Sequence, residues 1–257
     1  MKLAVISLSD EGACIANRLQ QGSADADIFL HEKVAESFGG SRFKSVITLT
    51  RKIFNQYDGL VYIAPCGVVV RAIAKNVRNK RTDPGVVVVD ARGRFAVSLL
   101  SGHEGGANDL AIAVSNIIGT EPVITTTTEA LKSVIVGIGC RRGVKAKAII
   151  GAVDAALKEA GVERAEVRLL ASADIKMKEK GLLEAANILG IPLRFIGSEE
   201  IRSSRRKFSR SDFVKEKVNL PAVAEPAALL AGRRTRLILP KMTSGTVTVA
   251  LARESSS

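Results

Sequence analysis

Residues 59–108 read GLVYIAPCGVVVRAIAKNVRNKRTDPGVVVVDARGRFAVSLLSGHEGGAN, and this stretch decides the fold class. A buried-strand run over 59–64 ends at Pro65, and residues 68–75 then follow a helical period. Two β-rich runs, 86–90 and 95–100, are joined by the short connection 91–94, which predicts a hairpin or tight turn around Gly93. The loop 101–108 leads into an apolar helix over 109–118. Strands and helices therefore alternate.

The same alternation extends to both sides of this stretch. A strand over 3–8, a helix over 13–20 and an apolar segment over 28–30 predict a βαβ opening. After the threonine run 125–128 the pattern restarts, with a strand over 132–138, a turn over 139–143 and a helix over 146–159. We therefore predict an α/β fold of two α/β domains, residues 1–130 and 131–257, each a mostly parallel sheet flanked by helices.

Composition excludes several classes of protein. The 257 residues are 46% apolar and 25% charged, which is the balance of a folded globular chain. No apolar run approaches the roughly 20 residues that span a bilayer, and the first ten residues become charged too early for a signal peptide. Cys14, Cys66 and Cys140 have no CxxC partner, so neither a disulfide framework nor a zinc site is expected. We predict a cytoplasmic protein without a membrane segment.

Charge is distributed unevenly along the chain. Residues 1–130 hold 14 basic and 13 acidic side chains, whereas residues 131–257 hold 24 and 13, which gives net charges of +1 and +11. Such a field attracts polyanions, which include nucleic acid, an anionic membrane and small molecules with many carboxylates or phosphates. The absence of Trp, the two Tyr and the lack of helix-turn-helix, RNP or zinc-finger spacing speak against nucleic acid. The basic segment 202–210 is predicted to be a mobile, solvated surface loop.

Loop 101–106, Ser-Gly-His-Glu-Gly-Gly, concentrates residue types suited to chemistry. His103 is one of two histidines in the chain, and its ordinary pKa range suits a proton shuttle. The alternative is a loop histidine that caps the following helix. Because free N–H groups at a helix start favour an anion, an anionic group of a substrate would fit here. Asn108 or Asp109 is equally suited to be an ordinary N-cap.

Three loops, around 65–67, 79–85 and 101–108, flank buried-strand candidates, and we predict that they share one binding crevice at the carboxyl ends of the strands. The cations between residues 71 and 94 include two that adjoin these loops, Arg71 and Lys80, and we predict that both contact ligand. Asp83 and Asp90 are better explained as turn formers.

Residues 137–143 read Gly-Ile-Gly-Cys-Arg-Arg-Gly and lie between a predicted strand and a predicted helix. The third glycine is one residue late for a dinucleotide fingerprint. The simpler interpretation is an anion-binding turn at a helix start, to which Arg141 and Arg142 add charge. Cys140 fits a small buried filler better than a nucleophile.

Longer blocks resemble a known family. The segments YDGLVYIAPCGVVVRAIA, KRTDPGVVVVD, GRFAVSLLSGHEGGANDLA and PVITTTT are similar to the amino-terminal region of cobalt-precorrin-5A hydrolases of anaerobic cobalamin biosynthesis. The segments VGIGCRRGV, LASADIKMKEKGLLEAA and EPAALLA resemble the carboxyl-terminal domain of that family, which also occurs alone as an accessory protein of the aerobic pathway. Family members commonly carry a middle segment, but here Thr128 runs almost directly into Val134.

The resemblance implies a reaction. Water opens the δ-lactone of a cobalt-bound, ring-contracted tetrapyrrole, and acetaldehyde leaves to give cobalt-precorrin-5B. The substrate is a polycarboxylate, which would give the basic half a purpose. Because cobalt arrives within the substrate, no cofactor and no protein metal site are expected. A homodimer and contacts with other cobalamin-pathway enzymes are also expected.

Residue roles follow from this chemistry and from motif position. His103 is expected to relay protons, with Glu104 orienting or assisting it, and backbone N–H groups near Gly105 and Gly106 are expected to bind the oxyanion. The peripheral carboxylates of the substrate are assigned to Arg71, Lys80, Arg141 and Arg142. The substrate site is further expected to include Ser101, Gly102, Asn108 and Gly139.

The sequence alone leaves two other classes of protein open. A non-catalytic protein that binds or hands over a corrinoid intermediate is favoured if the middle segment is needed for chemistry, and it would release no acetaldehyde. A basic nucleic-acid-binding protein would bind with a steep dependence on salt.

Overall fold

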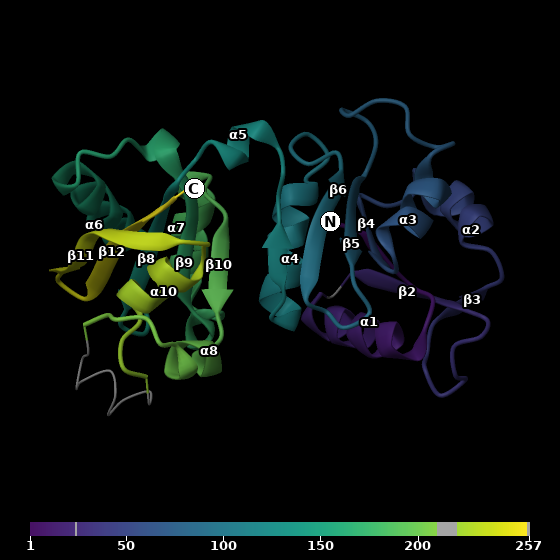
Figure 1. The fold of residues 1–257 in the computed structure, drawn as a ribbon, viewed down its shortest axis with the longest axis horizontal. Coiled ribbons are helices and arrows are strands. Elements are labelled where there is room, and N and C mark those ends of the chain that lie inside the picture. Colours follow the sequence, from purple (N-terminus) through teal and green to yellow (C-terminus); the bar gives the residue numbers. More distant parts are fainter. Residues whose placement is uncertain (24, 210–219, 256–257) are drawn as a thin grey trace. The chain divides into compact units, whose positions relative to one another are not determined.

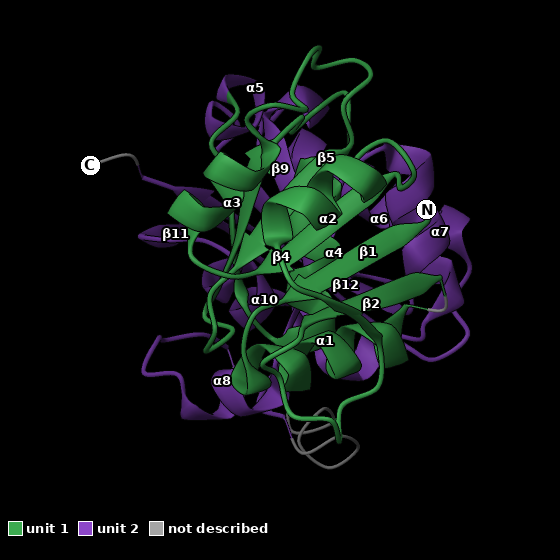
Figure 2. Ribbon diagram, turned by 90° about the vertical axis from the view of Figure 1, so that its right-hand side faces the viewer, with its two compact units in different colours: residues 1–126 green, residues 127–257 purple. Residues whose placement is uncertain are grey.

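The structure is a computed structural model that describes residues 1–23, 25–209 and 220–255. The chain divides into two compact units, residues 1–126 and 127–257, shown in green and purple in Figure 2. Each unit contains its own sheet, with helices packed against it. The predicted α/β fold with two mostly parallel sheets is therefore confirmed.

Unit 1 alternates strands and helices along the chain (Figure 1). Its elements are β1 (Leu3–Ser7), α1 (Asp10–Gly22), β2 (Ala26–His31), β3 (Ser41–Phe43), α2 (Val46–Ile53), β4 (Gly59–Ile63), α3 (Cys66–Ile73), β5 (Gly85–Val89), β6 (Phe95–Leu100), α4 (Ala107–Ile118) and β7 (Glu121–Val123).

The sheet of unit 1 has the order β3-β2-β1-β4-β5-β6-β7 within the described residues. The strands from β3 to β5 are parallel, whereas β6 runs antiparallel to β5 and parallel to β7. The β5–β6 connection is the predicted hairpin, and Gly93 in it has a φ of +66°. This hairpin reverses the chain direction and decides at which edge of the sheet the following loop lies.

Alternate residues of the strands face opposite helix layers, as the two-residue period of a strand requires. Val5, Val61 and Val87 are buried under α1 and α4. Ile6, Leu60 and Val88 are buried on the other face under α2 and α3. Figure 2 shows α1 on one side of these strands and α2 and α3 on the other.

Unit 2 repeats this alternation and ends in a long hairpin (Figure 1). Its elements are α5 (Thr127–Ala130), β8 (Val134–Cys140), α6 (Ala146–Glu159), the 3₁₀ turn Arg164–Glu166, β9 (Val167–Ala173), the 3₁₀ turn Asp174–Lys176, α7 (Lys180–Leu189), β10 (Leu193–Ile196), α8 (Ser198–Ser203), α10 (Ala224–Leu230), β11 (Thr235–Ser244) and β12 (Val247–Glu254).

The sheet of unit 2 has the order β10-β9-β8-β12-β11 in the part of the chain that the structure describes. β8, β9 and β10 are parallel, and β12 and β11 add antiparallel strands beside β8. α6 and α7 cover one face. α10 crosses the other face over Gly137, where an added Cβ would overlap Ala224 O and Ala228 N. Glycine at 137 therefore allows α10 to pack directly on the sheet.

The basic segment differs from its prediction where it is described. Arg202 and Ser203 end α8, the Arg206 guanidinium donates to Thr235 O at 2.5 Å, and Phe208 packs against a small cluster around Leu229. Arg210 lies outside the described residues. Residues 202 and 203 are therefore helical and not part of a loop, most of the described segment is exposed as predicted, and its mobility stays a prediction.

Among the described residues, no helix is both long and apolar enough to cross a membrane.

Glu225, at the start of α10, gives a first testable prediction. Its buried carboxylate accepts from Lys241 N at 2.8 Å and from Ser209 Oγ at 2.9 Å. Burial alone would raise the pKa of Glu225, but these donors and the Lys241 charge leave the pKa below its usual range. A carboxyl whose pKa is lower in the folded protein adds stability above its unfolded pKa, and that stability is lost as the pH falls through the folded pKa.

We therefore expect Glu225→Gln to reduce the free energy of unfolding at pH 7, and we expect the difference from the native chain to shrink between pH 5 and pH 3. Urea unfolding at a series of pH values measures this. Glu184→Gln, at an exposed position of α7, is the control and should follow the native pH dependence. A difference that stays constant with pH would contradict the role given to Glu225.

Candidate functional site

Two of the three predicted loops meet at one edge of the sheet of unit 1. Residues 79–85 lead into β5, and residues 101–106 leave β6, which is antiparallel to β5. Both loops therefore lie beside the start of β5. Lys80 Nζ lies 2.7 Å from Glu104 Oε1 and joins the two loops by an ion pair.

The third loop lies elsewhere. Residues 65–67 follow β4, which is parallel to β5, so this loop lies at the opposite edge of the sheet, where β5 ends. Arg71 donates to Gly67 O at 2.9 Å and belongs to that edge. The predicted crevice shared by all three loops at the carboxyl ends of the strands is wrong, because the β5–β6 hairpin turns the chain around before residue 101.

Glycines let the two remaining loops pack backbone against backbone. A Cβ on Gly85 would lie 2.6 Å from Gly105 O and 3.0 Å from Ala107 N. A Cβ on Gly105 would lie 2.8 Å from Asp83 O. Gly106 has a φ of +76° and is the residue before α4, so neither Asn108 nor Asp109 is the N-cap. The glycines of the motif are thus explained by close packing.

Four backbone amides of the loop and of the start of α4 are already engaged. Gly105 N donates to Ser101 O at 3.1 Å, and Gly106 N donates to His103 O at 3.4 Å. Ala107 N and Asn108 N, at the start of α4, donate to Ser101 O and Gly102 O. The Gly105 and Gly106 amides expected to bind the oxyanion, and the Ala107 and Asn108 amides at the helix start, are therefore engaged, because the loop folds back on its own carbonyls.

Asn108 has a structural position inside α4. Its side chain accepts from Ser98 Oγ at 2.8 Å and donates to Thr126 Oγ1 at 2.9 Å. A Cβ on Gly102 would lie 2.8 Å from Asn108 Oδ1, so Gly102 gives this amide its space. Both residues shape the loop from within, and their predicted contact with substrate stays a prediction.

Ser101 is conformationally unusual. It has a φ of +55°, and Arg234 is the other described non-glycine residue with a positive φ. Its side chain is buried, and its hydroxyl has no hydrogen-bond partner among the described residues. A left-handed residue and an unsatisfied buried hydroxyl both cost free energy.

His103 and Glu104 form the exposed tip of the loop. The hydrogen bond from Lys80 is the largest of several effects that hold the pKa of Glu104 below its usual range, and the charge of His103 acts in the same direction. Glu104 is therefore an ionised carboxylate close to His103. Its direct partner is Lys80, which differs from the expected pairing with His103.

A second cluster forms in unit 2, where β8 and β9 end. Gly139 is still within β8, opposite Thr248 of β12, and a Cβ on it would lie 3.4 Å from Val223 Cβ. The predicted turn over 139–143 therefore starts later, and Gly139 lies within the sheet and not in a binding loop. Arg141 and Arg142 follow the strand and are exposed.

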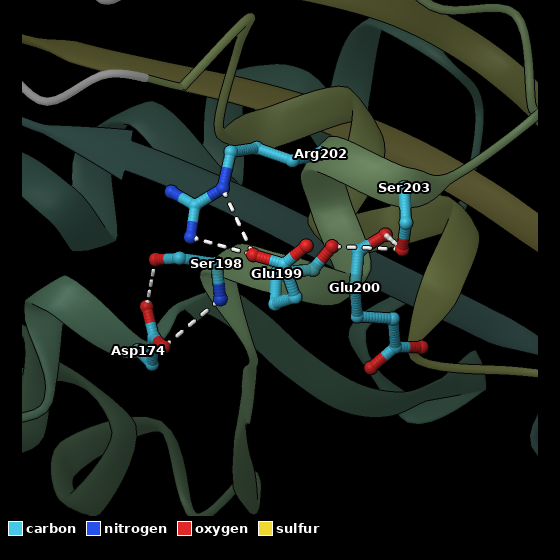
Figure 3. A network of polar contacts seen from close by, with 6 residues as sticks. All are labelled: Asp174, Ser198, Glu199, Glu200, Arg202 and Ser203. Carbon is cyan, nitrogen blue, oxygen red and sulfur yellow. Dashed lines mark hydrogen bonds and ion pairs between the residues drawn. The ribbon is translucent and has the colours of Figure 1, made fainter.

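Three residues that the sequence analysis did not single out, Asp174, Lys176 and Glu179, lie at the same edge. Burial raises the pKa of the Cys140 thiol, and Lys176 and Glu179 are close enough to shift it in opposite directions. The Glu179 carboxylate accepts from Gly143 N at 3.0 Å. Asp174 accepts from Ser198 N at 2.9 Å and from the Ser198 hydroxyl at the start of α8, as Figure 3 shows. The alternation of charge in residues 174–180, DIKMKEK, was the available signal.

The raised pKa of Cys140 keeps it a thiol at neutral pH, which disfavours it as a nucleophile or metal ligand. Within the described residues, no group of three or more His, Cys, Asp or Glu side chains is placed to hold a metal ion.

A hollow of about 750 Å³ in unit 1 lies apart from both clusters. It is lined by Asn17, Gln20, Gln21, Asp27, Ile28, Phe29, Gly39, Gly40, Ser41 and Tyr57. None of the predicted site residues lines it.

The fold and these clusters define a class of protein: a two-unit α/β protein with charged side chains gathered where loops meet at the sheet edges. Residues 48–129 match the family model Cobalamin synthesis G N-terminal, and residues 134–252 match Cobalamin synthesis G C-terminus. Together they cover more than half of the chain. The chain therefore belongs to the cobalamin synthesis G family, the family of the cobalt-precorrin-5A hydrolases that its sequence resembles.

Individual relatives agree with the family. The chain is 25% identical to the cobalt-precorrin-5A hydrolase of Priestia megaterium, over 97% of this chain and 94% of the relative. It is 25% identical to the cobalt-precorrin-5A hydrolase of Salmonella typhimurium, over 89% of this chain and 91% of the relative. The crystal structure of CobE, from the cobalamin biosynthetic pathway, is 34% identical, covers 49% of this chain and 92% of that chain, and superposes with a TM-score of 0.45.

The chain is shorter than the relative from Priestia megaterium that it matches. The alignment with the Priestia megaterium protein is 356 positions long, so at least 99 positions (356 minus 257) face gaps in this chain. Only residues 130–133 separate the two family models. The predicted lack of a middle segment is therefore confirmed.

Ser101 gives the second testable prediction. Ser101→Gly should raise the free energy of unfolding by about 1 kcal/mol, because it removes both the left-handed strain and the unsatisfied hydroxyl, against a smaller loss from the freer unfolded chain. Ser101→Ala removes only the hydroxyl and should stabilise less. Denaturant unfolding of the three proteins tests this, and two destabilised variants would show that the Ser101 hydroxyl is satisfied in solution.

Proposed function

We propose that the chain is a cobalt-precorrin-5A hydrolase of cobalamin biosynthesis, which opens the δ-lactone of its cobalt tetrapyrrole substrate and releases acetaldehyde to give cobalt-precorrin-5B. The observation that carries this proposal is the similarity to two proteins of that name over 97% and 89% of this chain, which includes both units. A cobalt corrinoid intermediate is accordingly the proposed ligand.

His103 is the proposed proton relay because it is exposed at the tip of the loop and close to a carboxylate. As water adds to the lactone carbonyl, the imidazole takes a proton from the water. It returns that proton to the ring oxygen as the carbon–oxygen bond breaks, which leaves an alcohol and a carboxylic acid, and the acid then releases its proton to solvent. Loss of the alcohol proton then breaks the carbon–carbon bond, acetaldehyde departs, and the macrocycle carbon takes up a proton.

The oxyanion formed at the lactone carbonyl needs donors other than the loop amides. Lys80 is the proposed donor, since its ammonium has three protons and lies 2.7 Å from Glu104 at the same edge as His103. Glu104 then positions Lys80. This role replaces the one expected for Glu104, which was to orient or assist His103. The contacts expected between Arg141 and Arg142 and the peripheral carboxylates stay a prediction.

Cobalt is part of the proposed substrate, so the proposed reaction uses no resident cofactor. Arg71 lies at the other edge of its sheet and, in this proposal, meets a carboxylate remote from the reacting carbons. Cytoplasmic location, a homodimer and contacts with other cobalamin-pathway enzymes stay predictions.

The third testable prediction concerns turnover. Purified protein incubated without oxygen with cobalt-precorrin-5A should release acetaldehyde, together with a product mass that shows addition of water and loss of the two-carbon fragment. His103→Ala should lower this turnover by about 100-fold or more, because a general acid–base group contributes on that scale. Near-normal turnover of this variant, with unchanged thermal stability, would remove His103 from the chemistry.

The fourth prediction separates Lys80 from its neighbours. Lys80→Met should lower the rate constant of lactone opening by about 100-fold, the scale of one lost oxyanion donor. Lys75→Met, which removes another exposed cation that follows α3, should leave the rate within about two-fold. Equal rates for the two variants would show that Lys80 acts only through net charge.

A non-catalytic hand-over protein is the second candidate. The observation in its favour is the short form, because at least 99 aligned positions of a catalytic relative (356 minus 257) have no counterpart here. Such a protein would bind cobalt-precorrin-5A and release no acetaldehyde until a partner is added. The same anaerobic assay therefore decides between the two candidates.

A further inference from the structure

The carboxyl edge of the parallel strands in unit 2 carries an unusual excess of cations. The segments 140–147 and 174–180, here called the basic edge, contain seven basic side chains and two acidic ones. The basic residues are Arg141, Arg142, Lys145, Lys147, Lys176, Lys178 and Lys180. The acidic residues are Asp174 and Glu179.

The fold brings these two segments together. β8 and β9 are parallel neighbours, so the loops that follow them leave the sheet at the same edge. α6 and α7 both start there, and neither start has a side-chain cap. Gly181 allows the two starts to touch, because an added Cβ would overlap Val144 O and lie 3.2 Å from Ala146 N. Two positive helix ends thus add to the charge of the side chains.

The two acidic residues are held by intramolecular bonds. Asp174 accepts from Ser198 and fixes the start of α8 (Figure 3). Glu179 reaches across to the other segment and accepts from Gly143 N at 3.0 Å. Among the described residues, no ion pair within 4.0 Å engages Lys145, Lys176 or Lys178. The basic edge therefore contains the carboxylate of Glu179, which is bound to a backbone amide of the edge itself, and three lysines without an ion pair among the described residues.

Apolar side chains lie among these cations. Ile175 is 44% exposed and Met177 is 37% exposed, and they alternate with Lys176 and Lys178 along the loop. Free phosphate or polyphosphate would leave both apolar side chains uncovered. A flat apolar ring system with carboxylates around its rim matches both components of the surface.

We propose that the basic edge binds the carboxylates of a tetrapyrrole-sized ring and that Glu179 is a built-in competitor, whose carboxylate occupies the Gly143 amide that a ligand carboxylate would otherwise take. The inference deepens the proposed function, on which its choice of ring system rests. Glu179 lowers the affinity by occupying a donor and by placing a negative charge among the cations, so it tunes release as well as binding.

Binding of uroporphyrin to the full chain tests this proposal. Uroporphyrin is a tetrapyrrole with carboxylates on every pyrrole ring, without cobalt or lactone, and its own fluorescence reports binding. Glu179→Gln keeps an acceptor for Gly143 N but removes the charge, so the Kd should fall by roughly three-fold to five-fold. The double variant Lys176→Gln and Lys178→Gln should raise the Kd by about ten-fold.

Matched controls lie at the far end of α6, roughly 20 Å from its start at 1.5 Å per residue. Glu159→Gln changes the net charge by +1, as Glu179→Gln does, and Lys158→Gln changes it by −1, half the change of the double variant; both control residues are exposed. Each should leave the Kd within about two-fold at physiological salt, where a charge at that distance is screened.

Two results would overturn the proposal. Equal effects of Glu179→Gln and Glu159→Gln would show that only net charge matters. Polyphosphate or single-stranded DNA that displaces uroporphyrin at equal charge concentration would show a general polyanion surface. Because no lactone is opened in this measurement, loss of binding is distinguishable from failure of the hydrolase assay.

Discussion

The antiparallel pairing of β5 with β6 is the constraint on which the candidate site of unit 1 depends. All neighbouring strands from β3 to β5 in the sheet are parallel. If β6 were also parallel to β5, residues 101–106 would lie at the edge where Arg71 lies. The hairpin around Gly93 instead returns the chain to the start of β5. Lys80, His103 and Glu104 meet there for this reason alone.

Backbone packing explains most of the glycine-rich loop. Gly85 and Gly105 allow two main chains to approach at distances that no Cβ permits, and the loop amides turn inward to carbonyls of the same loop. What remains for chemistry is the exposed tip, together with one cation that the neighbouring loop supplies. In the proposed function, the Lys80 side chain and not the Gly105 and Gly106 amides therefore stabilises the oxyanion.

Unit 2 has a different distribution of charge, with cations concentrated at one edge of its sheet. Its parallel strands end at one edge, its first two helices start there, and most charges of that edge are positive. Glu179 and Asp174 are the exceptions, and each is committed to an internal hydrogen bond. The two units therefore differ in kind: a small exposed tip with an ion pair in unit 1, and an extended basic edge in unit 2.

The sequence by itself determined the α/β class, the β5–β6 hairpin, the family and the concentration of positive charge after residue 130, because periodicity, turn chemistry and composition are local properties of the chain. Only the tertiary structure decided that Lys80 pairs with Glu104, that the backbones at Gly85 and Gly105 pack against each other, and that Glu179 reaches Gly143. The physical reason is that each of these contacts joins residues 20 or more positions apart in the sequence, which lie together only after the strands have paired. The hairpin already implied that the chain reverses before Ser101, and following strand direction through it would have separated Arg71 from His103.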